Sequence, residues 1–145
     1  MTHDRDLIRY YDQDAPRRDN AALGPTRIAW RNRFIELLAA EDRRRVIEFG
    51  CGPGHDGEAF AAAGLSWTGI DLSIEHARRA AGHGVPAVVG SLFHPPVRPR
   101  AFDAAWAMGD PGNTVAAMAS MARSKSASAT CTRVLIDQAA SKARG

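Results

Sequence analysis

The sequence of 145 residues is poor in cysteine and has no long apolar run. Its two cysteines, Cys51 and Cys131, form no C-x-x-C pair and no cluster with histidine, so we expect no zinc site. No apolar stretch approaches the roughly 20 residues that cross a bilayer. The first residues, Thr2 to Asp6, lack the apolar core of a signal peptide. We therefore expect a cytoplasmic protein with neither a membrane partner nor a metal.

Lysine is absent from residues 1–108, and aromatic residues are absent from residues 109–145. In the first range 14 arginines balance 14 acidic residues. The second range has five basic residues against two acidic ones, so it carries the whole formal charge of +3. A weakly basic tail rich in serine and alanine could touch nucleic acid, but solvated charges on a poorly packed end account for it better. We expect no nucleic-acid partner.

Apolar segments alternate with helical patterns along residues 24–108, which predicts an α/β domain around a parallel sheet. Residues 1–23 are expected to be an irregular cap segment with at most a short helix, and residues 109–145 a divergent, poorly ordered tail. The predicted strands are 45–49, 66–70, 85–89 and 101–108, and the predicted helices are 26–40, 55–63 and 73–81. In the tail, a helix over 115–121 and a fifth strand over 133–137 complete the expectation.

A glycine-rich turn joins the first predicted strand to the helix that follows, in the segment Val46-Ile47-Glu48-Phe49-Gly50-Cys51-Gly52-Pro53-Gly54. Glycine lets the backbone turn sharply and lets a ligand approach without meeting a Cβ, and the helix N-terminus offers free N–H donors. In such sheets the ligand binds at the carboxyl ends of the strands. We therefore expect Gly50, Gly52 and Gly54 to border a ligand.

Two ligand classes compete for this turn. Residues 52–57 formally match G-x-G-x-x-G, which is typical of dinucleotide sites. A carboxylate at Glu48 would repel a pyrophosphate, however, and attract the ammonium or sulfonium side of S-adenosylmethionine. Pro53 also removes an N–H that a pyrophosphate would use. The remaining alternative is an ordinary glycine turn in which Glu48 is salt-bridged to an arginine.

The second anchor is Asp71, which ends the next predicted strand seventeen residues after Gly54. A carboxylate at this place can accept both ribose hydroxyls of a nucleotide or of S-adenosylmethionine. Asp71 could instead cap the following helix, but Ser73 suits that role well. The ligand role is therefore the favoured interpretation of Asp71.

These segments resemble the class I S-adenosylmethionine-dependent methyltransferases, in the branch that acts on small molecules. Residues 48–54 look like the first motif of that family, E/D-x-G-x-G-x-G, and residues 69–73 look like its second. Residues 90–93 lie where the third motif usually sits, and residues 102–108 resemble the fourth strand. The resemblance covers about residues 10–108. It implies a Rossmann-like parallel sheet, S-adenosylmethionine as the cofactor and methyl transfer to a small-molecule acceptor.

Carried over position by position, the resemblance also implies a set of cofactor-binding residues. These are Glu48, Gly50, Cys51, Gly52, Gly54, Asp71, Leu72, Ser91, Leu92 and Ala107. Leu72 would pack on the adenine, Leu92 would meet it through its backbone, and Ala107 would lie beside the sulfonium. Ser91 stands where the family often has an aspartate that bonds the adenine amino group. No metal is implied.

The N-terminal segment and the histidines complete the expectations for the site. Tyr11, with Arg18 or Arg33, could close it from the N-terminal side. His55 and His94 are the histidines nearest to it and are expected to be exposed loop residues. No catalytic acid or base is identified, because methyl transfer from a sulfonium needs mainly proximity and in-line orientation.

The chain departs from the family pattern after Met108, where no P-G-G turn follows the fourth strand. We expect an incomplete sheet of about four to five strands instead of seven, truncated at the C-terminus or ending in a shifted reading frame, with activity impaired. An exposed sheet edge would then favour a homo-oligomer. Two other functions stay open: a fragment of an NAD(P)-binding oxidoreductase, and a non-catalytic remnant that binds cofactor.

Overall fold

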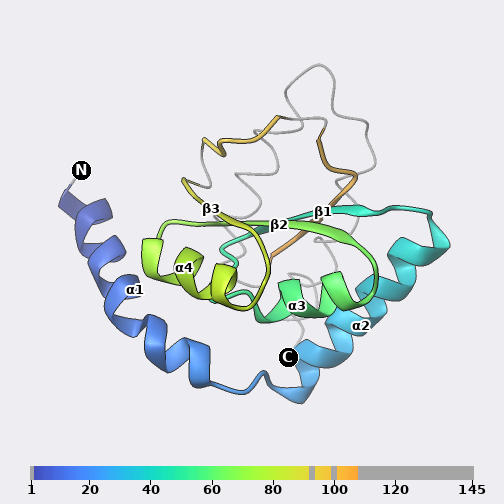
Figure 1. Cartoon of the computed structure of the whole chain (residues 1–145), viewed down its shortest axis with the longest axis horizontal. Coiled ribbons are helices and arrows are strands. Elements are labelled where there is room, and N and C mark those ends of the chain that lie inside the picture. Colours follow the sequence, from blue (N-terminus) through green and yellow to red (C-terminus); the bar gives the residue numbers. More distant parts are fainter. Residues whose placement is uncertain (1, 92–93, 99–100, 108–145) are drawn as a thin grey trace, which may run out of the picture.

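Four parallel strands form a single sheet in the order β3-β2-β1-β4 (Figure 1). The structure is a computed structural model and describes residues 2–91, 94–98 and 101–107. The strands are β1 (Arg45–Phe49), β2 (Ser66–Asp71), β3 (Ala87–Val89) and β4 (Ala104–Trp106). The predicted α/β fold with a parallel sheet is therefore confirmed, and β3 and β4 are the outer strands of the part that is described.

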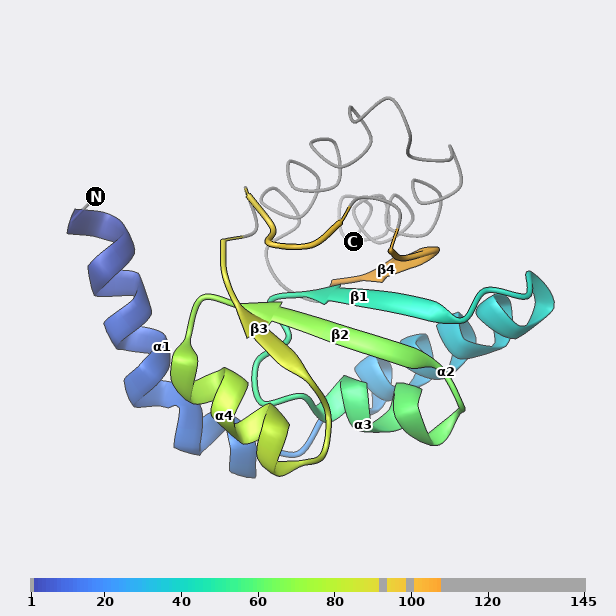
Figure 2. The same cartoon turned by 45° about the horizontal axis from the view of Figure 1, so that its top comes forward.

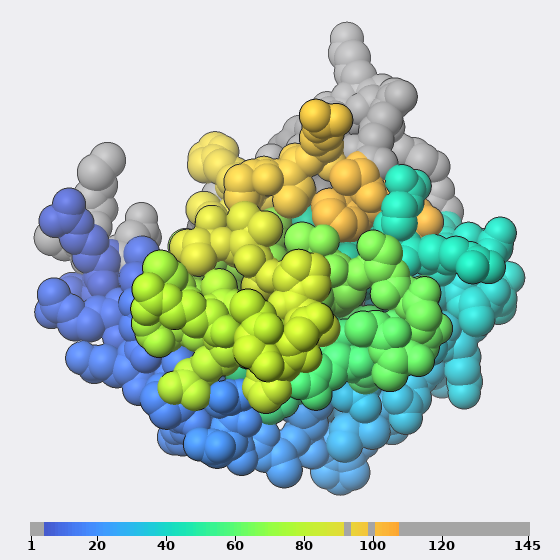
Figure 3. All heavy atoms as spheres, viewed as in Figure 1, coloured from blue at the N-terminus to red at the C-terminus, as the bar shows by residue number. Residues whose placement is uncertain are grey.

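Helices cover one face of this sheet. They are α1 (Thr2–Asn20), α2 (Pro25–Ala40), α3 (His55–Ala62) and α4 (Ile74–Gly82). Figure 2 shows α2, α3 and α4 beneath the strands, and α1 packs alongside α4. Helix α3 connects β1 to β2 and α4 connects β2 to β3, as the crossovers of a parallel sheet require. In the space-filling view, α1 and α2 border α3 and α4 on the outside (Figure 3).

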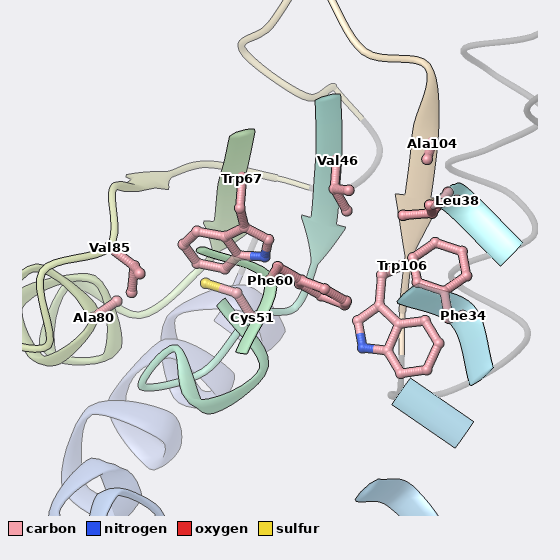
Figure 4. Packing of buried hydrophobic residues seen from close by; sticks show 10 residues of the cluster. All are labelled: Phe34, Leu38, Val46, Cys51, Phe60, Trp67, Ala80, Val85, Ala104 and Trp106. Atoms are coloured by element: carbon pink, nitrogen blue, oxygen red, sulfur yellow. The ribbon is translucent and has the colours of Figure 1, made fainter. Parts of the chain in front are cut away.

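The main apolar core lies between the sheet and the helices. Trp106 of β4 and Phe34 of α2 have ring centroids 4.8 Å apart, and Phe60 of α3 packs edge-on against both (Figure 4). Val46 belongs to this core, whereas Ile47 and Phe49 pack into a second cluster with Ile70 and Ala105. Because side chains alternate along a strand, Glu48 lies on the helix-covered face of β1.

The predicted strands and helices differ from the observed ones mainly at their ends. The first strand, 45–49, is as predicted, and α2 begins one residue earlier than expected. The third strand begins at Ala87, because the Val85 N–H bonds the Ala80 carbonyl and closes α4. The fourth begins at Ala104, after a loop in which Asp103 accepts hydrogen bonds from the backbone N–H groups of residues 44 and 45.

The N-terminal segment is where the sequence prediction was wrong. We expected at most a short helix within residues 1–23, whereas α1 runs over 19 residues. Its polar side chains hold it to α4: Asp12 accepts a hydrogen bond from the Ser73 hydroxyl, and Asp19 accepts one from Arg79. Contacts between distant segments supply stabilisation that the weak apolar pattern of this segment does not reveal.

Several expectations fall outside the described residues. The helix over 115–121, the strand over 133–137, the ordering of the tail, Cys131 and Leu92 are among them. Within the described ranges, no helix has the length and apolar character needed to cross a membrane.

Candidate cofactor site

The residues implicated by sequence gather at the carboxyl edge of the sheet. The strand register places Phe49 beside Ile70, Asp71 beside Val89, and Glu48 beside Trp106. Residues that follow the ends of β1, β2, β3 and β4 therefore meet at one edge. Leu72 and Ser91 are half-buried there, and Ala107 is buried next to β4.

The three glycines of the turn have different roles. All three have left-handed backbone angles, with φ of +66° at Gly50, +55° at Gly52 and +87° at Gly54. A Cβ on Gly50 or Gly52 would point into open space, whereas a Cβ on Gly54 would lie 2.9 Å from Cγ2 of Val85. Gly50 and Gly52 therefore leave room for a ligand. Gly54 also lets α3 and α4 pack closely, and its place beside a ligand stays a prediction.

Glu48 is buried at the end of β1. Its residue is 2% exposed, and among the described residues neither carboxylate oxygen has a hydrogen-bond partner. Burial raises the pKa of Glu48 well above its usual range; the nearby Asp56 carboxylate adds to this, and the Arg27 guanidinium opposes it. A buried polar group of this kind is costly unless something else satisfies it, and a cation at the turn would do so.

The arginines that might have paired with Glu48 are bound to Asp56 instead. Arg27 Nη2 lies 2.7 Å from Asp56 Oδ2, and Arg31 Nη1 lies 3.5 Å from Asp56 Oδ1. The indole N–H of Trp106 donates to Asp56 Oδ2 at 2.9 Å. This arrangement removes the alternative of an arginine salt bridge to Glu48. Sequence reasoning missed Asp56, because an acidic residue in the first turn of a helix is usually on the surface.

Asp71 holds the glycine turn against the start of α4. Its Oδ2 accepts the Gly52 N–H at 2.8 Å, and its Oδ1 accepts the Ser73 N–H at 2.9 Å. Nδ1 of His76 lies 3.2 Å from the same Oδ1. Ser73 caps α4 as predicted, with its hydroxyl accepting the His76 N–H. A carboxylate offers about four acceptor positions. Protein donors take three of those positions, and the role of Asp71 toward the ribose hydroxyls stays a prediction.

The Cys51 side chain points away from the edge of the sheet. Its sulfur lies in the core against Gly69, where an added Cβ would be 2.6 Å from it (Figure 4). Burial raises the pKa of the Cys51 thiol, which keeps it neutral, and the Glu48 and Asp71 carboxylates act in the same direction. Any contact of Cys51 with a ligand would come from its backbone.

Of the three residues expected to close the site from the N-terminal side, Tyr11 lies next to His76, and Arg18 lies next to Tyr11. The Tyr11 ring centroid is 6.1 Å from that of His76, and the Arg18 guanidinium lies 5.1 Å from the Tyr11 ring centroid. Arg33 is exposed on α2. His55 is not an exposed loop residue as expected: it begins α3, is half-buried, and has Nε2 3.1 Å from the Arg18 carbonyl.

His94 is exposed, in agreement with the prediction. Among the described residues, no group of three or more histidine, cysteine or acidic side chains is arranged to hold a metal ion.

A parallel α/β sheet with a glycine turn after β1 and a carboxylate at the end of β2 defines the class I methyltransferase type of domain. A family model described as "Methyltransferase domain" matches residues 46–135, well over half of the chain. The chain belongs to this family of S-adenosylmethionine-dependent enzymes. The match extends into residues 109–145. That these residues form a divergent tail, from a truncation or a shifted reading frame, stays a prediction.

Several known proteins similar to this chain carry the name of methyltransferases. Over 81 residues it is 36% identical to the ubiquinone biosynthesis O-methyltransferase of Bordetella avium, a match that covers 56% of this chain and 32% of that enzyme. Magnesium protoporphyrin IX methyltransferase from Synechocystis, solved with bound SAM, aligns with a TM-score of 0.61 at 16% identity, covering 82% of this chain and 70% of that one. The DhpI–SAH complex aligns with a TM-score of 0.54 at 24% identity, covering 72% and 52%. The chain thus spans about a third of the length of the curated relatives it matches.

Proposed function

We propose that this chain binds S-adenosylmethionine at the carboxyl edge of its sheet and transfers the methyl group to a small-molecule acceptor in the cytoplasm. The observation that carries the proposal is the buried Glu48 carboxyl group, whose two oxygens have no hydrogen-bond partner within residues 2–91, 94–98 and 101–107. The methionine ammonium is a donor of the right charge for those oxygens, and a charge-assisted bond would offset the cost of burying Glu48.

The other residues of this edge would divide the cofactor among them. The open space at Gly50 and Gly52 would take the methionine portion, and Asp71 would face the ribose. The side chain of Leu72 and the backbone after β3, at Ser91 and Leu92, would border the adenine. The bound cofactor supplies an electrophilic methyl group on its sulfonium, so the protein has mainly to hold the two reactants in line, with Ala107 beside the sulfur.

The hydrogen bonds of the turn favour this cofactor over a dinucleotide. A dinucleotide turn presents its free N–H groups to the pyrophosphate. Here the Gly52 N–H already donates to Asp71, and Pro53 has no N–H to offer. Asp71 also places a carboxylate beside the turn, where it would repel an anion. The fragment of an NAD(P)-dependent oxidoreductase is therefore the weaker candidate.

The acceptor class follows from the relatives rather than from the site. Matched enzymes carry the name of O-methyltransferases in ubiquinone biosynthesis, so hydroxylated ubiquinone precursors are the first acceptors to test.

We propose that a homo-oligomer would form by pairing two chains through β3 or β4, the outer strands of the described sheet, because such pairing would extend the sheet.

Calorimetric titration of the full chain tests the cofactor. We expect S-adenosylhomocysteine and S-adenosylmethionine to bind, and NAD⁺ and NADP⁺ to give no heat of binding. Binding of NAD(P) without binding of S-adenosylhomocysteine would overturn the proposal. Release of S-adenosylhomocysteine from S-adenosylmethionine in the presence of an acceptor then tests turnover. Cofactor binding without turnover on any acceptor would leave the non-catalytic remnant as the function.

A further inference from the structure

A buried histidine that the proposed function does not use stands next to Asp71. His76 lies in the first turn of α4 and is 1% exposed. Its backbone N–H bonds the Ser73 hydroxyl and its Nδ1 lies 3.2 Å from Asp71 Oδ1, whereas its Nε2 has no hydrogen-bond partner in the part of the chain that the structure describes. The Tyr11 ring packs nearby.

The contact between His76 and Asp71 has a defined direction. A carboxylate only accepts hydrogen bonds, so Nδ1 of His76 carries the proton and donates it. Asp71 Oδ1 then receives two protein donors, the Ser73 N–H and the His76 Nδ1–H, while Oδ2 receives one, the Gly52 N–H. The acceptor position that remains is on Oδ2, the oxygen next to the glycine turn.

We infer that His76 is a positioning residue: by holding Asp71 Oδ1, it fixes the carboxylate so that Oδ2 presents one acceptor position to a ribose hydroxyl of the cofactor. This inference rests on the proposed function, because it assigns the ribose to Asp71. Under this inference Asp71 makes one main contact with the ribose, through Oδ2, and does not contact both hydroxyls equally.

An apolar side chain would satisfy the packing at this position without burying an unpartnered nitrogen. Leucine or methionine could fill similar space and would leave no polar atom without a partner. The Nδ1 donor is therefore what histidine adds here. Without it, Oδ1 would keep only the Ser73 N–H, and the carboxylate could rotate about its Cβ–Cγ bond, whose torsion is broad.

The test compares three variants in the full chain. His76→Leu removes the donor, His76→Asn keeps an N–H close to the position of Nδ1, and Arg78→Gly lowers the helix propensity of α4 at an exposed position away from Asp71. The ligands for calorimetry are S-adenosylhomocysteine and its 2′-deoxy and 3′-deoxy analogues. The readout is the loss of affinity when each hydroxyl is removed, which a purely structural role of His76 would not change.

In the wild type we expect removal of one of the two hydroxyls to weaken binding by at least about tenfold, and removal of the other by much less. In His76→Leu the difference between the two losses of affinity should shrink to about threefold or less, mainly because S-adenosylhomocysteine itself binds more weakly. His76→Asn should restore most of it, and Arg78→Gly should keep it although its melting temperature falls.

Folded His76→Leu with wild-type discrimination, or His76→Asn behaving like His76→Leu, would overturn the inference. Should His76→Leu fail to fold, His76→Met takes its place in the comparison. If the wild type does not bind S-adenosylhomocysteine, the proposed function itself fails. A wild type that binds it and discriminates equally against both deoxy analogues contradicts only the role of His76.

Discussion

Replacing Glu48 by glutamine should make the ligand-free protein more stable and its cofactor binding weaker. The Glu48 carboxyl group is buried, its oxygens have no hydrogen-bond partner among the residues described, and its pKa is raised mainly by burial. Glutamine has nearly the same shape as the protonated carboxyl group but never becomes charged. The variant therefore removes the cost of a buried charge without opening a cavity.

The sign of the pH dependence follows from the raised pKa. Above the ordinary value of 4.5, the unfolded chain loses the Glu48 proton while the folded chain still holds it. The free energy of unfolding therefore falls as the pH rises from that value toward the folded pKa, by at most about 1.4 kcal/mol per pH unit from this group. Glu48→Gln should match the wild type near pH 4 and exceed it at pH 8.

Binding should change in the opposite direction. A charge-assisted bond to the methionine ammonium contributes about 1.5–3 kcal/mol, so Glu48→Gln should weaken S-adenosylhomocysteine binding by about 10- to 150-fold. Because the ammonium favours ionised Glu48, cofactor binding by the wild type should also release a proton, and the variant should not.

Urea unfolding from pH 4 to pH 8 measures the first effect, and calorimetry in buffers of different ionisation enthalpy measures the other two. Glu36→Gln, at an exposed carboxylate on α2, is the matched control and should change none of them. A Glu48→Gln protein that is less stable than the wild type at pH 8, or that binds S-adenosylhomocysteine equally well, would refute the reasoning.

Three further predictions concern the turn, α1 and the core. Gly52→Ala and Gly64→Ala both place a side chain at positive φ and should each cost about 1 kcal/mol of stability, but only Gly52→Ala should weaken S-adenosylhomocysteine binding in calorimetry, by about tenfold or more. Asp19 of α1 raises the pKa of His83, so the contact stabilises the fold below the ordinary value of 6.5 and is lost as the pH rises through the folded pKa. Amide exchange in α1 should accelerate as the pH rises through the folded pKa of His83, and His83→Gln should abolish this pH dependence. A pH dependence that persists in the variant would point to another group. Asp56→Ala leaves two guanidinium groups without their buried partner and should lower the free energy of unfolding in urea by about 3–5 kcal/mol, whereas a loss below 1 kcal/mol would contradict that role.

The strands and the helices between them could be predicted because their signals are local. The apolar segments at 45–49 and 66–70 and the glycines that follow them mark where the chain turns, whatever it packs against. Helix α1 could not be predicted in the same way. Its polar face pairs with residues about 60 positions away, as between Asp19 and Arg79, and no local period records such a pair.

The site shows the same division. Sequence alone placed Glu48 and Asp71 at the ends of neighbouring strands, and the parallel sheet brings them to one edge. It did not indicate that Gly54 serves packing, that Cys51 turns into the core, or that Asp71 is already engaged by Gly52. Those facts depend on which surfaces meet when α3 and α4 pack on the sheet.

The order of elements, the glycine turn and the acidic residue before it were thus determined by the sequence, since each depends on residues within one short segment. The chemical state of that acidic residue was decided only by the tertiary structure. Arg27 and Arg31 were available to neutralise Glu48, but the packing of α2 against α3 gives both to Asp56. Glu48 is left buried and without a partner in the described part of the chain. Charge pairing depends on the distance between packed elements, and the spacing of residues along the chain does not contain that distance.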